Sequence, residues 1–197
     1  MSEHFTTLQE IFHYKLGSAL TMEHDSLDLL DVLEHAAMRS DLKEHFNEHA
    51  AETRGQIENL HNCFVLLSEE PKRVPSPTTK GLVKEAKSAI GKTDDMLVDA
   101  VVLGAALEAE HYETGVYESL LVLAKASGAT GIAELLNQNL EQEKAAIEQI
   151  KAAADRIART DAEEQESRVE ESHAEDGAGA VPTPAVKVPR FMPPGSI

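Results

Sequence analysis

The chain has 197 residues, which is enough for one domain with a substantial core, and 42% of them are hydrophobic. Aromatic residues make up only 4% and Trp is absent, so the composition favours helices over a β-sandwich. The formal net charge of -17 disfavours binding to nucleic acids and to anionic membranes, and it would attract cations.

Cysteine usage and the N-terminal sequence bear on the cellular compartment. Cys63 is the single cysteine, so no intrachain disulfide can form, as is typical of a reducing compartment. The N-terminal residues MSEHFTTLQE lack a basic region followed by an apolar run, so we expect no signal peptide. No apolar run approaches the length of a membrane span. These features predict a cytoplasmic protein that does not enter a membrane.

Apolar residues recur at spacings of three and four along most of the chain, a pattern typical of amphipathic helices. Four long helices are predicted as two hairpins, with a short helix in the Pro-containing connection between the hairpins. The predicted spans are about Phe5–Met38, Ser40 or Asp41–Leu67, Lys80–Ile90, Thr93 or Asp94–Gly128, and Thr130–Ile157. Asp41 and Glu44 have the spacing of a capping box, and Gly128 is a typical residue just past a helix end. The expected fold is an all-α four-helix bundle with a crossover connection that contains a short extra helix.

The character of the chain changes near residue 161. Residues 1–160 carry the helical stripes and form the predicted bundle domain, whereas residues 161–197 are first acidic and then Pro-rich. The first part of this tail is compatible with an extension of the fourth long helix, and the remainder is predicted to be disordered. Val188, Phe191 and Met192 near its end could dock to a protein partner or an encapsulating shell, and a merely solubilising tail is the simpler alternative.

Six polar side chains fall on the predicted buried stripes of the four long helices. They are Glu23, His49, Glu52, Glu110, Glu113 and Glu143. A buried carboxylate is costly unless protons, cations or a metal ion compensate its charge. Antiparallel helices place residues equally far from the turn at one level, and Glu113 and Glu143 are symmetric about Gly128. Residues three apart, such as His49 and Glu52, share a helix face. The six side chains are therefore predicted to converge inside the bundle if the hairpins pack through these faces.

The types of these side chains indicate which metal they would bind. Carboxylate oxygen and imidazole nitrogen suit iron or manganese, and the lack of a cysteine cluster argues against a thiolate site. Each glutamate taken singly is more often a solvated surface residue, so the metal site is predicted from the joint pattern. Gln56 could hydrogen-bond a ligand or lie at the rim, while Tyr112 and Tyr117 could assist redox chemistry or simply pack in the core.

Several stretches also resemble a known family. MEHDSL around Glu23, LKEHFNEHAAETRGQIENL, TKGLVKEAKSAI, LEAEHYETGVYESL and GIAELLNQNLEQEKAA are similar, in order and spacing, to the YciF-type ferritin-like family. The resemblance runs from about Leu8 to Ile157. It implies a four-helix ferritin-like bundle, often a dimer, with a proposed di-metal centre and an association with bacterial stress responses. The implied ligands are the same six residues, and the EHYE motif also resembles the ExxE motif of rubrerythrin-like oxidoreductases.

Two positions depart from the ferritin-like pattern. Such sites usually carry Glu-x-x-His on two helices, but here the second helix has the reversed order, and Ala146 stands three residues after Glu143. The family often has an acidic residue where this chain has Ile147. The fourth long helix is therefore expected to supply one ligand, which leaves the second metal position in doubt.

The leading functional hypothesis is a ferritin-like protein that binds two iron or manganese ions and has ferroxidase or peroxide-consuming activity in a stress response. The alternative is a non-enzymatic helical stress or interaction protein with a degenerate metal site and a tail that serves as a docking peptide. A homodimer is the assembly that the family resemblance implies.

Overall fold

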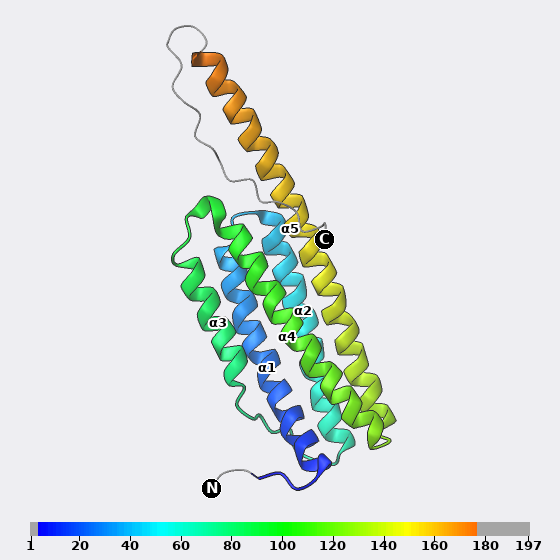
Figure 1. Cartoon of the computed structure of the whole chain (residues 1–197). Coiled ribbons are helices and arrows are strands. Elements are labelled where there is room, and N and C mark those ends of the chain that lie inside the picture. The colour runs from blue at the N-terminus through cyan, green and yellow to red at the C-terminus, as the bar shows by residue number, and fades with distance from the viewer. Residues whose placement is uncertain (1–3, 177–197) are drawn as a thin grey trace, which may run out of the picture. The chain divides into compact units, whose positions relative to one another are not determined.

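The structure is a computed structural model that describes the backbone of residues 4–176 and the side chains of residues 4–160. The elements are α1 (Leu8–Ala36), α2 (Ser40–Leu66), α3 (Pro77–Ile90), the 3-10 helix η1 (Asp95–Leu97), α4 (Val98–Ala126) and α5 (Thr130–Asp176) (Figure 1). The described residues form no β-strand, which confirms the all-α prediction.

Two hairpins build the bundle. One is α1 with α2 and the other is α4 with α5, and side chains from all four helices meet in shared apolar clusters. The short helix α3 lies along α1 and α4, within the crossover that joins the hairpins (Figure 1). Gly128 has a φ of +72°, so it ends α4 in the left-handed conformation that glycine adopts most readily, as predicted. In the described residues, no helix is long and apolar enough to cross a membrane.

The starts of three helices differ from the sequence expectation, and local features of the chain accompany each difference. Helix α1 begins at Leu8 rather than near Phe5, since Thr7 and Glu10 form a capping box. Helix α3 begins at Pro77 rather than Lys80, with the proline in its first turn. Helix α4 begins at Val98, after a 3-10 turn, because the hydroxyl of Thr93 donates back to a carbonyl oxygen of α3 at 2.8 Å instead of capping α4.

The capping box predicted at Asp41 and Glu44 is not formed, because the N-cap of α2 is Arg39, two residues before Asp41, and it makes no side-chain cap hydrogen bond. The carboxylate of Asp41 instead lies 2.8 Å from the guanidinium of Arg156 on α5 and 3.5 Å from that of Arg39. The Asp41 side chain, which its spacing predicted to cap α2, therefore forms ion pairs instead.

Helix α5 continues beyond the compact unit that ends at Ile157. The backbone of residues 161–176 is helical, which agrees with an extension of the fourth long helix into the acidic segment. The predicted disorder of the Pro-rich segment and the docking role of Val188, Phe191 and Met192 lie outside the described residues.

The apolar core is divided into two clusters along the bundle axis. One contains buried apolar residues within 12–22 of α1 and 117–124 of α4. The other contains those within 29–33 of α1, Ala37 just after this helix, and those within 98–109 of α4. The same division occurs in the other two long helices. In α2 the two clusters are separated by the interval between Phe46 and Ile57, and in α5 by the interval between Leu140 and Ile150. The interval between the clusters is where each long helix carries a buried polar residue, so the fold leaves one polar layer across the middle of the bundle.

Gly17 determines how closely the crossover lies on α1. A Cβ atom at this position would lie 2.6 Å from the carbonyl oxygen of Lys72 and 2.8 Å from a methyl group of Val74, whose backbone N–H donates to the Gly17 carbonyl at 2.9 Å. The glycine that weakens the helical pattern in the sequence therefore allows backbone to pack directly against the helix.

Replacing Gly17 by Ala is expected to destabilise the protein by about 1–3 kcal/mol, because the added methyl group must displace backbone atoms. The control is Gly115→Ala in the exposed face of α4, where a Cβ meets nothing within 4 Å. There the same substitution should stabilise the helix by about 0.5–1 kcal/mol. Urea unfolding of both variants measures the difference, and equal effects would contradict the close packing at Gly17.

Candidate metal centre

Five of the six predicted site residues are almost fully buried in the polar layer. Their exposed fractions are Glu23 0%, His49 3%, Glu110 1%, Glu113 2% and Glu143 0%. All four long helices contribute, since these residues come from α1, α2, α4 and α5. Four carboxyl groups in one apolar interior are a rare concentration of ionisable groups, because each loses its hydration on burial.

The buried residues form two groups that share one member. His49, Glu110 and Glu143 each offer a ligand atom within 4.8 Å of the others, and so do Glu23, Glu113 and Glu143. Among the described residues these are the groups of three or more metal-ligating side chains that lie this close together. Helix α5 supplies Glu143 to both groups, whereas the neighbouring Ala146 and Ile147 are buried apolar residues. The two candidate groups therefore have Glu143 in common.

Glu52 lies at the edge of this arrangement and belongs to neither group. Its side chain is 50% exposed, and its Oε2 atom lies 3.1 Å from Nδ1 of His49. The other ring nitrogen, Nε2, lies 3.0 Å from Oε1 of Glu110. His49 is therefore held between one exposed and one buried carboxylate, which fixes the orientation of its ring.

Buried oxygen atoms without a hydrogen-bond partner test whether this donor set fits a metal ion. Such atoms are Oε2 of Glu23, Oε2 of Glu110, Oε2 of Glu113 and both carboxylate oxygens of Glu143. Unsatisfied buried acceptors are uncommon in folded proteins and each one requires an explanation. Hard oxygen donors with one imidazole match the ligand preference of iron and manganese, so the residues fit the group that the sequence predicts.

The electrostatics of the layer show what the carboxyl groups do without a cation. Burial raises the pKa of Glu23 to about 8, although a hydrogen bond from Tyr117 opposes the shift. Burial, followed by the charges of neighbouring glutamates, also holds the pKa values of Glu113 and Glu143 well above the usual range. Protons can therefore compensate these charges near neutral pH, and a cation that displaced the protons would do so as well.

His49 has the opposite balance of effects. Burial alone would lower its pKa, but the hydrogen bonds with Glu110 and Glu52 outweigh burial and raise the pKa to about 10. The hydrogen bond with His49 in turn lowers the pKa of Glu52. Without a metal ion, the imidazolium thus forms part of the charge compensation of the layer.

Sequence reasoning named Tyr117 but not its contact with a site carboxylate, and it did not name Asn139. The hydroxyl of the fully buried Tyr117 donates to Oε1 of Glu23 at 2.5 Å, and its oxygen lies 2.9 Å from the amide nitrogen of Asn139. The signal for Asn139 was present as a polar residue on the apolar stripe of α5, one turn before Glu143.

The side chain of Gln56 is also fully buried, but neither of its amide atoms has a hydrogen-bond partner among the described residues. It is therefore an interior residue rather than part of an exposed rim. Tyr112 is half-buried and packs against the apolar cluster of α1 and α4, as expected for a core residue.

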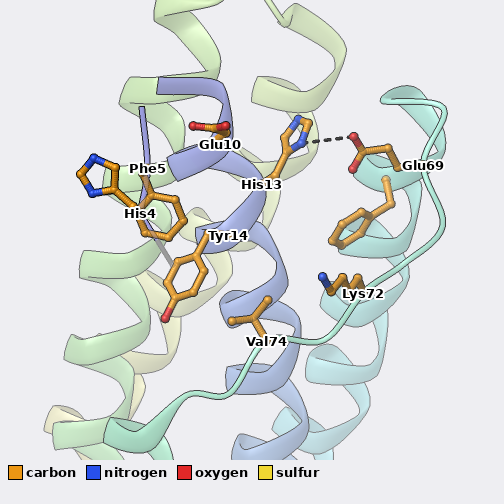
Figure 2. A pocket seen from close by; sticks show the side chains of 9 residues that line it. His4, Phe5, Glu10, His13, Tyr14, Glu69, Lys72 and Val74 are labelled. Carbon is orange, nitrogen blue, oxygen red and sulfur yellow. Dashed lines mark ion pairs between the residues drawn. The ribbon is translucent and has the colours of Figure 1, made fainter. Parts of the chain in front are cut away.

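A surface pocket of about 390 Å³ lies near the start of α1, and it includes none of the six predicted site residues (Figure 2). It contains an ion pair in which Nδ1 of His13 lies 3.2 Å from Glu69 (Figure 2). The polar layer is lined by buried side chains of the helices instead, so the candidate chemistry and this open pocket are separate features.

Comparisons with known proteins agree with this architecture. Residues 7–163 match a family described as a domain of unknown function, DUF892. Protein YciF of Escherichia coli K12 is 34% identical over 141 residues, which are 71% of this chain and 85% of YciF. The crystal structure of the E. coli stress protein YciF superposes with a TM-score of 0.75 at 29% identity, covering 79% of this chain and 99% of that one.

Two further solved structures extend the comparison. YcfI from Rhodopseudomonas palustris, described as a putative structural protein, has a TM-score of 0.74 at 30% identity and covers 77% of this chain and 97% of its own. A dodecameric thioferritin from Bacteroides fragilis, a bacterioferritin-related protein, shares the fold with a TM-score of 0.60 at 16% identity, over 80% of this chain and 91% of that one. The resemblance noted in the sequence is thus confirmed: the bundle is ferritin-like, and the chain belongs to the DUF892 family of YciF-like proteins.

Proposed function

We propose that the polar layer binds two iron or manganese ions and supports ferroxidase or peroxide-consuming activity in a stress response. The observation that carries this proposal is the set of five buried carboxylate oxygens without hydrogen-bond partners, which come from α1, α4 and α5 and lie beside His49 of α2. When bound, iron or manganese would supply the electrons needed to reduce oxygen or peroxide. The similarity to a bacterial stress protein supports the physiological setting.

The residues divide into distinct roles under this proposal. Glu143 is the shared ligand of both positions, with His49 and Glu110 completing one and Glu23 and Glu113 the other. The apolar clusters on either side of the layer exclude bulk water from it, which strengthens every electrostatic contact inside. The group of Glu23, Glu113 and Glu143 would hold the second ion with three carboxylates, so α5 needs to supply only Glu143.

Glu52 takes a different role from the one expected from the sequence. It accepts a hydrogen bond from Nδ1 of His49, which leaves Nε2 facing Glu110 inside the layer. Once His49 is deprotonated, this contact holds the tautomer whose Nε2 lone pair can bind a metal ion. We therefore assign Glu52 to the orientation of His49 rather than to direct binding.

The competing proposal is a non-enzymatic helical structural or interaction protein. It is supported by the description of the R. palustris relative as a putative structural protein and by the raised pKa values, which allow the carboxyl groups to stay protonated without a metal ion. Self-association as a dimer and docking through the C-terminal tail are proposals under either function.

Anaerobic titration with Mn(II) and Fe(II) at pH 7.5 separates the two functions. The expected result is binding close to two ions per chain, with a rise in melting temperature because the ions bind only the folded bundle. Glu113→Gln should reduce the stoichiometry to one, since Glu113 belongs to a single group. The matched control is Glu118→Gln, an exposed position on the same helix, which should retain both ions.

Activity is then measured on the loaded protein as Fe(II) oxidation or peroxide loss. A folded wild-type protein that binds neither ion and has an unchanged melting temperature would exclude the metal-dependent function and leave the structural one. Binding without turnover would limit the proposal to a metal site.

A further inference from the structure

The hydroxyl group of Tyr117 is the hydrogen-bond donor to one oxygen of Glu23. The oxygen Oε1 of Glu23 accepts this bond at 2.5 Å, and the second oxygen, Oε2, is buried without a partner. Tyr117 itself is fully buried in the apolar cluster next to the polar layer. The two oxygens of this carboxylate are therefore in unequal environments.

Asn139 determines the direction of that hydrogen bond. Its side-chain Nδ2 atom lies 3.2 Å from the backbone carbonyl oxygen of Gln56 and 2.9 Å from the Tyr117 hydroxyl oxygen. A carbonyl oxygen can only accept, so the Asn139 atom that faces Gln56 must be the amide nitrogen. The second hydrogen of that nitrogen points to the Tyr117 oxygen, and the single hydroxyl hydrogen of Tyr117 is left for Glu23.

Asn59 supports the same orientation from the other side. Its amide nitrogen donates to Oδ1 of Asn139 at 2.7 Å. Swapping the oxygen and nitrogen positions of the Asn139 amide would therefore break at least one hydrogen bond. The donors thus run in one direction from Asn59 through Asn139 and Tyr117 to Glu23, and they link α2, α5, α4 and α1.

We propose that Tyr117, oriented by Asn139, is a positioning residue that holds Oε1 of Glu23 and leaves Oε2 as the oxygen available to a metal ion. This inference rests on the proposed function of the layer, and it adds two residues to the centre that are neither carboxylates nor imidazoles. Outer hydrogen-bond partners of ligands typically change metal affinity by about 10–100-fold when they are removed.

The first test uses the metal-free protein. The Tyr117 hydroxyl proton should give a downfield NMR resonance that exchanges slowly with water. The resonance should be absent in Tyr117→Phe, exchange faster in Asn139→Leu, and persist in the control Tyr112→Phe, whose hydroxyl belongs to a half-buried residue of the same helix. Unchanged exchange in Asn139→Leu would overturn the orienting role of Asn139.

The second test measures Mn(II) affinity in a double-mutant cycle. Tyr117→Phe should weaken binding about 10–100-fold, Asn139→Leu should weaken it less, and Tyr112→Phe should leave it unchanged. Because Asn139 acts through Tyr117, the double variant should match Tyr117→Phe within about twofold. Multiplied losses, or wild-type affinity in Tyr117→Phe, would overturn the inference. A wild-type protein that binds no Mn(II) would instead refute the proposed function, and the hydroxyl resonance would then decide the hydrogen-bond direction by itself.

Discussion

Replacing Glu143 by Gln is expected to abolish binding at both ion positions. Glu143 is the one residue common to the two groups, and both of its oxygens are buried without hydrogen-bond partners. Loss of a shared anionic ligand should lower affinity for Mn(II) by more than the roughly 10–100-fold typical of an outer hydrogen-bond partner. Glu113→Gln, by contrast, should spare one position.

The same substitution should stabilise the metal-free protein. Burial and the charges of Glu113 and Glu23 disfavour the ionised form of Glu143, whereas glutamine keeps the shape and carries no charge. Urea unfolding and metal titration of one preparation measure both effects. The control is Glu141→Gln, an exposed residue of α5 that pairs with Lys144, which should change neither quantity appreciably. Retention of two ions by Glu143→Gln would refute the assignment of this residue.

The stability of the metal-free protein is expected to fall as pH rises. Glu23 has a folded-state pKa of about 8 against an ordinary value of 4.5, so the folded protein keeps a proton that the unfolded chain releases. The stabilising effect is therefore complete below pH 4.5 and is lost as pH rises through about 8. His49 acts in the same direction, since its effect is complete below pH 6.5 and is lost as pH rises towards about 10. Together these groups should lower the unfolding free energy by the order of a few kcal/mol.

Metal ions should reverse this trend. The ligands must lose their protons to bind, so the stabilisation by Mn(II) should grow over the same pH range in which the metal-free protein weakens. Urea unfolding at pH 5.5, 7 and 8.5, with and without Mn(II), measures both slopes.

A control is needed because the net charge of -17 also weakens the fold as further carboxylates ionise. Glu23→Gln removes the buried titrating carboxyl group and leaves the surface charge in place. Without metal, the unfolding free energy of this variant should therefore change less with pH than that of the wild type. Identical slopes in the two proteins would show that the buried layer does not control the pH response.

Much of the architecture could be predicted because it depends on local periodicity. The apolar spacing of three and four commits each segment to a helix with one buried face, and Gly128 supplies the left-handed residue that a tight turn requires. The polar positions within those stripes were also visible, because a glutamate on a buried face stands out against Leu and Ala. This is why five of the six predicted site residues proved to be buried together.

The remainder depended on contacts between segments that are distant in sequence. Asp41 has capping-box spacing, but in the bundle its carboxylate lies against the guanidinium of Arg156 on α5. Helix termini shift in this way because a side chain binds the partner that folding brings closest, and spacing within one helix carries no information about that partner.

The site likewise has one part that the sequence determined and one part that depends on contacts between helices. The sequence by itself determined the helices and the carboxylate and imidazole side chains that lie on their buried faces. Only the tertiary structure decided that Glu52 remains half exposed beside His49 and that Asn139 directs Tyr117 towards Glu23. These outcomes depend on how far each helix is rotated about its axis, and that rotation is set by the packing of whole helices against one another rather than by any local motif.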